Sequence, residues 1–309
     1  MKKVDIAIIG AGPAGLCAGI YAARAKRSVV MFERAIPGGQ QTLTDKIDNY
    51  PGTGKEGISG VLLSQLMEAQ AKSFGVEILC DNVTAVELKG QPKTIETTYN
   101  GTFEAKAVIL ATGRDPKPLG IPGEEEFRGR GVSYCAVCDG PFFRGKEVSV
   151  IGGGNSALEE ALYLAKFAKK VTVVHRRQEF RADKIVQERV RANPLITVEM
   201  GYCPVEVQGK TLMEGLVLEH METKKRKTLL VNAMFIYVGN HPNTLFFKEQ
   251  VACDEAGYLV SDETMHTSVE GVFAAGDVRQ KSLYQVVTAV ADGAIAAIEA
   301  DKYIDEVLS

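Results

Sequence analysis

Short apolar runs alternate with helical stretches and glycine-rich turns along this chain of 309 residues. Two such segments repeat one another: residues 6–33 read IAIIGAGPAGLCAGIYAARAKRSVVMFE, and residues 148–175 read VSVIGGGNSALEEALYLAKFAKKVTVVH. The key small residues align at a constant offset of 142 positions, in the pairs Gly10 and Gly152, Gly12 and Gly154, and Gly15 and Ala157. Each copy predicts a strand, a glycine turn, a helix and a second strand, which together form a βαβ unit.

The glycine pattern has a physical explanation if a dinucleotide lies across each turn. The first glycine allows a tight turn, the second lets the backbone approach a pyrophosphate, and a small third residue lets helix and strand pack closely. Phosphates then lie at a helix N-terminus, where free N–H groups and the helix dipole favour anions. A turn that binds nothing is the alternative, but two copies in the same context indicate two dinucleotide sites.

The last strand residue of each copy distinguishes the two sites. In the first copy it is Glu33, whose carboxylate can accept hydrogen bonds from ribose hydroxyls, as FAD or NAD requires. In the second copy it is His175, and Arg176, Arg177 and Arg181 follow. A basic cluster attracts a 2′-phosphate and a carboxylate repels it, so the second site is predicted to prefer NADPH. The alternative is that these residues form a solvated surface cluster.

Chain breakers interrupt the pattern in two places. An apolar strand at 105–113 leads into GRDPKP at 113–118, and an apolar strand at 233–238 leads into GNHPN at 239–243. The second dinucleotide unit lies between these crossings. We therefore expect a hinge at the crossings and a discontinuous first domain with a second domain inserted into it, with boundaries at 1–114 plus 245–309 and at 115–244.

The C-terminal part completes the first domain. Residues 271–277, GVFAAGD, are predicted to form another buried strand, and a long helix is predicted from about 283 to 303. The predicted fold class is α/β, with two Rossmann-like nucleotide-binding domains of the three-layer ββα/βα kind, the second inserted into the first.

Composition and charge narrow the classes of protein. Hydrophobic residues make up 45% and charged residues 24% of the chain, as in globular proteins, and the formal net charge of -3 argues against a general nucleic-acid binder. No uncharged apolar run approaches the roughly 18 residues of a membrane span. Asp5 and the early glycines break a signal-peptide reading of the N-terminus, so we expect a cytoplasmic protein with no nucleic-acid or membrane partner.

Six cysteines are present, and two of them form a Cys-x-x-Cys pair. The other four, which are predicted to be small buried apolar residues, are Cys17, Cys80, Cys203 and Cys253. The pair, Cys135 and Cys138, lies in the inserted domain, where this spacing at a helix start permits a disulfide and a reactive thiolate. The neighbouring Asp139 is placed to move protons to and from a leaving thiolate.

Other interpretations of this segment stay open. A structural zinc site needs about four ligands, and no second pair of Cys or His lies nearby in the sequence. The two thiols could also be inert and buried, and Asp139 could serve only as a helix cap.

These motifs, in this order, resemble the small bacterial type of thioredoxin reductase over nearly the whole chain. The resemblance rests on Gly10–Gly15, Gly38–Gln40, Asn49–Gly52, Ala111–Gly113, Cys135–Gly140, Gly152–Ala157, His175–Arg177 with Arg181, and Phe273–Val278. It implies two Rossmann-like domains, FAD and NADPH as cofactors, thioredoxin as the protein substrate, no metal, and a homodimer.

The resemblance also implies roles for individual residues. FAD would be bound by Gly10, Gly12, Pro13, Ala14, Gly15, Glu33, Gly39, Gln40, Asn49, Gly113, Asp277 and Gln285, with Asp277 bonding the ribitol chain. NADPH would be held by Gly152, Gly154, Asn155, Ser156, His175, Arg176, Arg177 and Arg181. Cys138 would face the flavin, Cys135 would attack the protein substrate, and Asp139 would act as acid and base.

Two positions depart from the family pattern. Val137 stands where many relatives have threonine, which leaves the sulfur chemistry unchanged, and Tyr284 stands where many carry arginine, which puts one flavin or hinge contact in question. Relatives that take electrons from ferredoxin lack the NADPH motifs that this chain has. The competing functions are a flavoprotein serving another thioredoxin-like or peroxide-reducing partner, a flavin dithiol oxidase, and a flavin-containing redox sensor.

Overall fold

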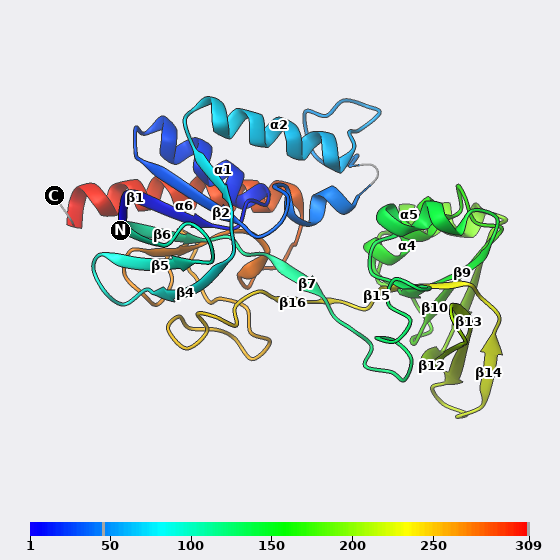
Figure 1. Ribbon diagram of the computed structural model, residues 1–309. Coiled ribbons are helices and arrows are strands. Elements are labelled where there is room, and N and C mark those ends of the chain that lie inside the picture. Colours follow the sequence, from blue (N-terminus) through cyan, green and yellow to red (C-terminus); the bar gives the residue numbers. More distant parts are fainter. Residues whose placement is uncertain (45–46, 308–309) are drawn as a thin grey trace. The chain divides into compact units, whose positions relative to one another are not determined.

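The chain folds into two compact units in the computed structural model, which describes residues 1–44 and 47–307. Unit 1 contains Met1–Asp115 together with the chain from His241 onward, and unit 2 contains Pro116–Asn240 (Figure 1). These boundaries differ from the predicted ones by one residue at the first crossing and by four at the second. Both crossings contain short strands, β7 (Arg114–Pro116) at the first and β16 (Asn240–Pro242) at the second, and these two strands pair.

Unit 1 is built on a mixed sheet with the strand order β3-β2-β1-β6-β5-β4, in which β17 also pairs with β6. The strands β1, β2, β3, β6 and β17 are parallel, whereas β5 and β4 run antiparallel to their neighbours. The strand bounds are β1 Lys2–Ile9, β2 Val29–Glu33, β3 Glu77–Cys80, β4 Val83–Glu87, β5 Lys93–Thr97, β6 Thr102–Leu110 and β17 Val272–Ala274. The helices are α1 Pro13–Arg24, α2 Gly60–Ser73 and α6 Val286–Val307, with 3-10 turns η1 Gly39–Leu43 and η3 Gly276–Val278.

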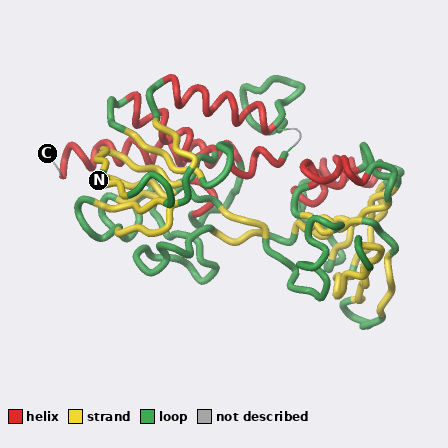
Figure 2. Tube along the Cα trace, in the orientation of Figure 1, coloured by secondary structure: helices red, strands yellow, loops and turns green. Residues whose placement is uncertain are grey.

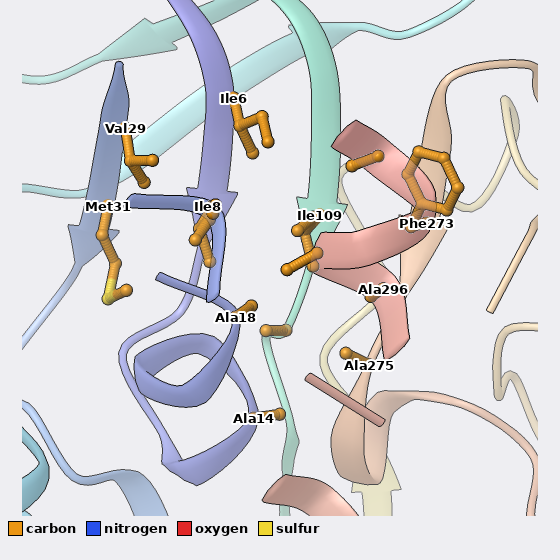
Figure 3. Close-up of a cluster of buried hydrophobic side chains, with 14 of the residues drawn as sticks. Ile6, Ile8, Ala14, Ala18, Val29, Met31, Ile109, Phe273, Ala275 and Ala296 are labelled. Atoms are coloured by element: carbon orange, nitrogen blue, oxygen red, sulfur yellow. The ribbon is translucent and has the colours of Figure 1, made fainter. Parts of the chain in front are cut away.

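Alternation along the strands gives this sheet an apolar layer on each face. On β1, Ile6 and Ile8 join a cluster with α1 and α6, whereas Ala7 and Ile9 join a cluster on the opposite face. Figure 3 shows the first cluster, with side chains contributed by Ile8, Met31, Ile109, Ala14 and Ala18. Each fully buried isoleucine stabilises the fold by about 1.5–3 kcal/mol, so this layer holds the glycine turn between β1 and α1 in place.

Unit 2 has three layers, as Figures 1 and 2 show. A parallel sheet of order β11-β10-β9-β15-β8 is covered on one face by α4 and α5, and its other face shares a core with a small antiparallel sheet, β12-β13-β14. The strands are β8 Val132–Ser133, β9 Glu147–Gly152, β10 Lys170–His175, β11 Ile196–Met200, β12 Tyr202–Gly209, β13 Met213–His220, β14 Arg226–Leu229 and β15 Ala233–Tyr237. The helices are α3 Ala136–Asp139, α4 Asn155–Leu164 and α5 Lys184–Ala192, and a 3-10 turn, η2 Gly140–Phe143, continues directly from α3.

The predicted fold class is confirmed, and so are both βαβ units, β1–α1–β2 and β9–α4–β10. The strand predicted at 271–277 is wrong in its second half, because β17 ends at Ala274 and a 3-10 turn follows. Gly276 takes a φ of +80°, and its N–H donates to the buried Asp292 carboxylate at 3.1 Å, which turns the chain. None of the helices formed by the described residues combines the length and apolarity that a bilayer crossing needs.

Candidate nucleotide and dithiol sites

The first glycine turn joins β1 to α1, and only at Gly12 among its three glycines is there space for an added Cβ or a ligand atom. A Cβ on Gly10, whose φ is +106°, would lie 2.3 Å from the Ala111 carbonyl oxygen, and one on Gly15 would lie 1.9 Å from the Gly10 carbonyl oxygen. At Gly12, the residue preceding α1, the nearest atom would be 4.0 Å away, on Gly39. Gly10 and Gly15 are therefore needed for packing, whereas Gly12 leaves the space that a phosphate needs at the helix start.

Glu33 ends β2 and lies beside this turn. Its carboxylate accepts hydrogen bonds from the Ala11 N–H and the Ala35 N–H, both at 3.0 Å. A pocket of about 320 Å³ opens next to it, within unit 1, and its lining includes Gly10, Glu33, Asp81, Thr112, Asn243 and Phe246. Each carboxylate oxygen accepts one backbone bond and keeps capacity for a further donor from the pocket.

The remaining residues predicted to bind FAD also lie in unit 1. Asn49 donates to the Gln285 side chain at 3.1 Å, and Gln40 donates to the Arg114 carbonyl oxygen. Gly39, with a φ of +59°, approaches Gly12 closely, while a side chain on Gly113 would meet open space. Pro13 and Ala14 form the first turn of α1.

Asp277 is surrounded by cations. Its carboxylate lies 3.1 Å from the Arg114 guanidinium and 3.4 Å from Lys281, yet its Oδ1 is buried and has no hydrogen-bond partner among the described residues. The Arg114 guanidinium also lies 4.3 Å from the centre of the Tyr284 ring. This chain has Tyr284 where many relatives carry arginine. Arg114 and Lys281 supply the positive charge beside Asp277.

The second glycine turn repeats the first in unit 2. A Cβ on Gly152 would lie 2.4 Å from the Tyr237 carbonyl oxygen, whereas one on Gly154 would meet nothing within 4 Å. Asn155, the first residue of α4, bonds Asp183 twice, through its Oδ1 to the Asp183 N–H at 2.7 Å and through its Nδ2 to the carboxylate at 2.8 Å. Ser156 is exposed beside it. The open position again lies at the start of a helix.

The basic cluster after β10 divides into one buried and three exposed residues. His175 is only 5% exposed, its ring lies where a Cβ on Gly153 would come within 2.4 Å, and its Nε2 bonds the Glu179 carbonyl at 3.1 Å. Burial, together with the nearby arginine charges, lowers the pKa of His175, so the ring is neutral near pH 7. The exposed residues are Arg176, Arg177 and Arg181. The buried His175 ring therefore packs against the backbone of the turn at Gly153. The exposed positive charge of the cluster comes from the three arginines.

Cys135 and Cys138 form a disulfide with an S–S distance of 2.15 Å. Cys135 precedes α3, and its Sγ accepts a hydrogen bond from the Cys138 N–H at 3.1 Å, while the Ser133 hydroxyl accepts the Cys135 N–H at 3.0 Å. The Asp139 side chain makes no capping hydrogen bond at the following 3-10 turn. The disulfide supports the redox interpretation of the pair, and Asp139 occupies the N-cap position of η2 without a side-chain capping bond.

The parallel sheet of unit 2 brings these features together. β8 leads into Cys135, β9 leads into the second glycine turn, and β15 lies between and pairs with both strands in parallel. Since parallel strands end at the same edge of a sheet, the disulfide and the glycine turn lie at one carboxyl edge. Across the described residues, no group of three or more His, Cys, Asp or Glu side chains is placed to hold a metal ion.

The other four cysteines are free. Cys17 is buried as predicted, and burial raises the pKa of its thiol to about 11. The same prediction is wrong for Cys80, which is exposed because it ends a strand at the edge of the sheet, with its thiol directed to the Ala35 carbonyl oxygen at 3.2 Å. Cys203 and Cys253 are half-buried.

Several residues that contact the predicted sites carry little or no signal for that role in the sequence. Arg114 reads as part of a linker, Asp183 as a surface acid, and Tyr237 as one more member of an apolar strand. Phe142 is 81% exposed just after the disulfide, where an apolar run would predict burial. A weak signal exists only for Asp183, which follows the basic loop and precedes a helix.

The fold and these sites define a class of redox enzyme: the chain belongs to the pyridine nucleotide-disulphide oxidoreductase family, whose model matches residues 4–293. It is 47% identical to the thioredoxin reductase of Peptoclostridium acidaminophilum over 307 residues, 97% of each chain. Among solved structures, the thioredoxin reductase of Lactococcus lactis is 44% identical with a TM-score of 0.95, covering 98% of this chain and 100% of that one. The thioredoxin reductase of T. acidophilum is 35% identical with a TM-score of 0.93, covering 99% and 100%. These similarities confirm the resemblance seen in the sequence.

Proposed function

We propose that this chain is an FAD-containing thioredoxin reductase, which uses NADPH to reduce the disulfide of a thioredoxin. The observation that carries the proposal is the joint placement of the Cys135–Cys138 disulfide and an arginine-bordered glycine turn at one edge of the sheet of unit 2. Similarity along the full chain to proteins named thioredoxin reductase supports the same conclusion.

Unit 1 fits FAD in three respects. Gly12 leaves space at the start of α1, Glu33 presents a carboxylate beside the 320 Å³ pocket, and the Asp277 Oδ1 lacks a hydrogen-bond partner among the described residues. The Lys281 ammonium lies 3.4 Å from this oxygen without forming a hydrogen bond, which leaves the oxygen able to accept one from a ribityl hydroxyl. When bound, FAD accepts a hydride from NADPH and supplies two electrons to the disulfide.

Cys135 is the better placed nucleophile once the disulfide is reduced. The N–H of Cys138 already points at its Sγ and would stabilise a thiolate there. The Cys135 thiolate attacks one sulfur of the partner disulfide, and the other partner sulfur leaves as a thiolate. Cys138 then attacks Cys135, restores the internal disulfide and releases the reduced partner, while Asp139 exchanges protons with the sulfurs.

The surface beside the disulfide suits a protein partner. Cys138 is exposed, and the neighbouring Phe142 presents its ring almost entirely to solvent. An exposed phenylalanine next to a reactive disulfide offers apolar contact area to a docking protein. The homodimer and the cytoplasmic location expected from the sequence remain predictions.

The test is anaerobic reduction of the purified yellow protein, followed by flavin absorbance. NADPH should bleach the flavin faster than NADH, and added oxidised thioredoxin should restore the colour. In Cys135→Ser the bleaching should persist and the recovery should be lost, because the sulfur that attacks the partner is missing. Bleaching by neither nucleotide would contradict the NADPH site, and recovery with oxygen but not with thioredoxin would indicate a dithiol oxidase.

A further inference from the structure

Tyr237 links the second glycine turn to the disulfide. It is the last residue of β15, paired with Gly152 of β9, and its carbonyl oxygen is the atom that excludes a side chain from Gly152. Its hydroxyl oxygen accepts a hydrogen bond from the N–H of Ala136 at 2.9 Å. Ala136 is the first residue of α3, between the two cysteines in sequence, so the tyrosine reaches the turn that the disulfide closes.

The N–H that Tyr237 binds cannot easily find another partner. The first N–H groups of a helix have no acceptor within the helix, and Ala136 is 0% exposed, so water does not reach it. The neighbouring N–H groups are used locally, that of Cys138 by the Cys135 sulfur and that of Asp139 by the Cys135 carbonyl oxygen. The ring of Tyr237 is fixed because it packs against the core that contains Ala136 and Ala157.

The charges around the hydroxyl keep it in its protonated form. Burial makes the largest contribution to the raised pKa of Tyr237. The negative charges of Glu160 and Asp139 raise it further. A phenol that accepts from Ala136 still has its own proton, and the carboxylates of Glu160 and Asp139 are the charges that favour keeping it. The hydroxyl thus stays a neutral acceptor for the Ala136 N–H.

We propose that Tyr237 is a positioning residue that biases the Cys135–Cys138 couple toward the disulfide by holding the Ala136 N–H. The proposal rests on the function proposed above, and it concerns the strength of the dithiol as a reductant. Reduction adds two electrons and two protons and breaks the S–S bond, which frees the first turn of α3 to move. Without the tyrosine hydroxyl, the disulfide form retains a buried N–H without an acceptor.

The reduced form can relieve that loss in two ways. The released turn can expose the Ala136 N–H to water, or the N–H can turn toward the Cys135 thiolate and stabilise it. Both responses stabilise the dithiol relative to the disulfide, so removing the hydroxyl should shift the equilibrium toward the dithiol. The couple should become easier to reduce, and the dithiol should become a weaker donor of electrons to its partner.

The test compares the wild-type holoprotein with Tyr237→Phe, which keeps the ring and removes the hydroxyl. Each is equilibrated anaerobically with set ratios of reduced and oxidised dithiothreitol, whose two thiols close to a cyclic disulfide as they give up the electrons. Acid quenching, alkylation and mass spectrometry then give the reduced fraction of the peptide that contains both cysteines. Tyr202→Phe loses the same group from the antiparallel sheet of unit 2 and serves as the matched control.

We expect the dithiol–disulfide equilibrium constant of Tyr237→Phe to shift toward the dithiol by about tenfold, about 30 mV for a two-electron couple. The control should stay within about twofold of wild type. A shift of less than twofold in Tyr237→Phe, or a shift toward the disulfide, would overturn the proposal. The measurement needs neither NADPH nor thioredoxin, so it stands even if the proposed function fails.

A second measurement uses the wild-type protein alone and covers the case in which the variant folds poorly. Hydrogen exchange at the Ala136 amide is measured in the oxidised and reduced protein, with single-residue resolution. If the bond to Tyr237 favours the disulfide, this amide should exchange more slowly in the oxidised form. Equal rates in the two forms would reject the coupling.

Discussion

The two glycine turns share a backbone plan and differ in the side chain that supports them. In unit 1 the turn after β1 is bonded by a carboxylate, because Glu33 accepts the Ala11 N–H. In unit 2 the corresponding residue, His175, contributes a buried neutral ring beneath Gly153, and the Arg181 N–H donates to the Gly153 carbonyl oxygen at 2.7 Å. One unit thus places a negative charge at its nucleotide turn, and the other surrounds its turn with exposed arginines.

The two units therefore share one βαβ geometry and differ in the residues at the end of the second strand and in the loop that follows it. Packing alone accounts for the strand, the first glycine and the helix start that the two copies share, since a Cβ at either first glycine would overlap a backbone carbonyl. We predict that the ligand preference is carried by the side chains at the end of the second strand and in the loop after it. Variants can therefore separate the two contributions.

The largest effect is expected from the first glycine of the first turn. Gly10→Ala forces a side chain onto a residue with φ of +106° and into the Ala111 carbonyl, so we expect the free energy of unfolding to fall by more than about 3 kcal/mol. Gly12→Ala has space and should lose less than about 1 kcal/mol while FAD affinity falls at least about tenfold. Thermal unfolding and flavin retention measure the two. Equal loss of stability in both variants would contradict the prediction that Gly10 is needed for packing and Gly12 is not.

A smaller effect, confined to the nucleotide, is expected from the exposed arginines. Replacing both Arg176 and Arg177 by alanine removes charge-assisted hydrogen bonds to a 2′-phosphate. We expect kcat/KM for NADPH to fall by about 10- to 100-fold and that for NADH to change by less than about threefold. Arg191→Ala, on the exposed side of α5, is the control. A parallel loss with both nucleotides would mean that the arginines do not read the phosphate.

The smallest effect is expected from the titration of His175. Its pKa is lowered in the folded chain, so below the unfolded value of about 6.5 the unfolded state binds the proton first. Wild-type stability should therefore fall as the pH drops from 7 toward 5, and His175→Phe, which keeps a ring beneath Gly153, should lack that part of the fall. Urea unfolding at a series of pH values measures the difference. An identical pH dependence in both proteins would place the imidazole in an environment that does not depress its pKa.

Much of this arrangement could be predicted from the sequence because it depends on local patterns. The glycine spacing, the repeat and the Cys-x-x-Cys spacing each express a short-range geometric requirement, and both turns and the disulfide occur where these patterns lie. The burial of His175 could not be predicted, because it depends on how the following loop folds back to Asn155 and Gly153. For the same reason, Tyr237 is predicted only as a core residue of an apolar strand. The sequence does not show that its hydroxyl reaches the Ala136 N–H, 101 residues away.

The close packing of α6 on α1 has a consequence for the synthesis of the chain. A Cβ on Gly293 of α6 would lie 2.1 Å from the Ala14 carbonyl oxygen, so α6 lies directly on the first turn of α1, which is synthesised much earlier. Residues 1–115 therefore leave the ribosome with one apolar face of α1 uncovered. At roughly 5–20 residues per second, the 170 residues between Asp115 and the start of α6 at Val286 take about 9–34 s to be made. Unit 2 is contiguous and can fold during this interval. The apolar face of α1 in unit 1 remains exposed to aggregation until α6 packs on it.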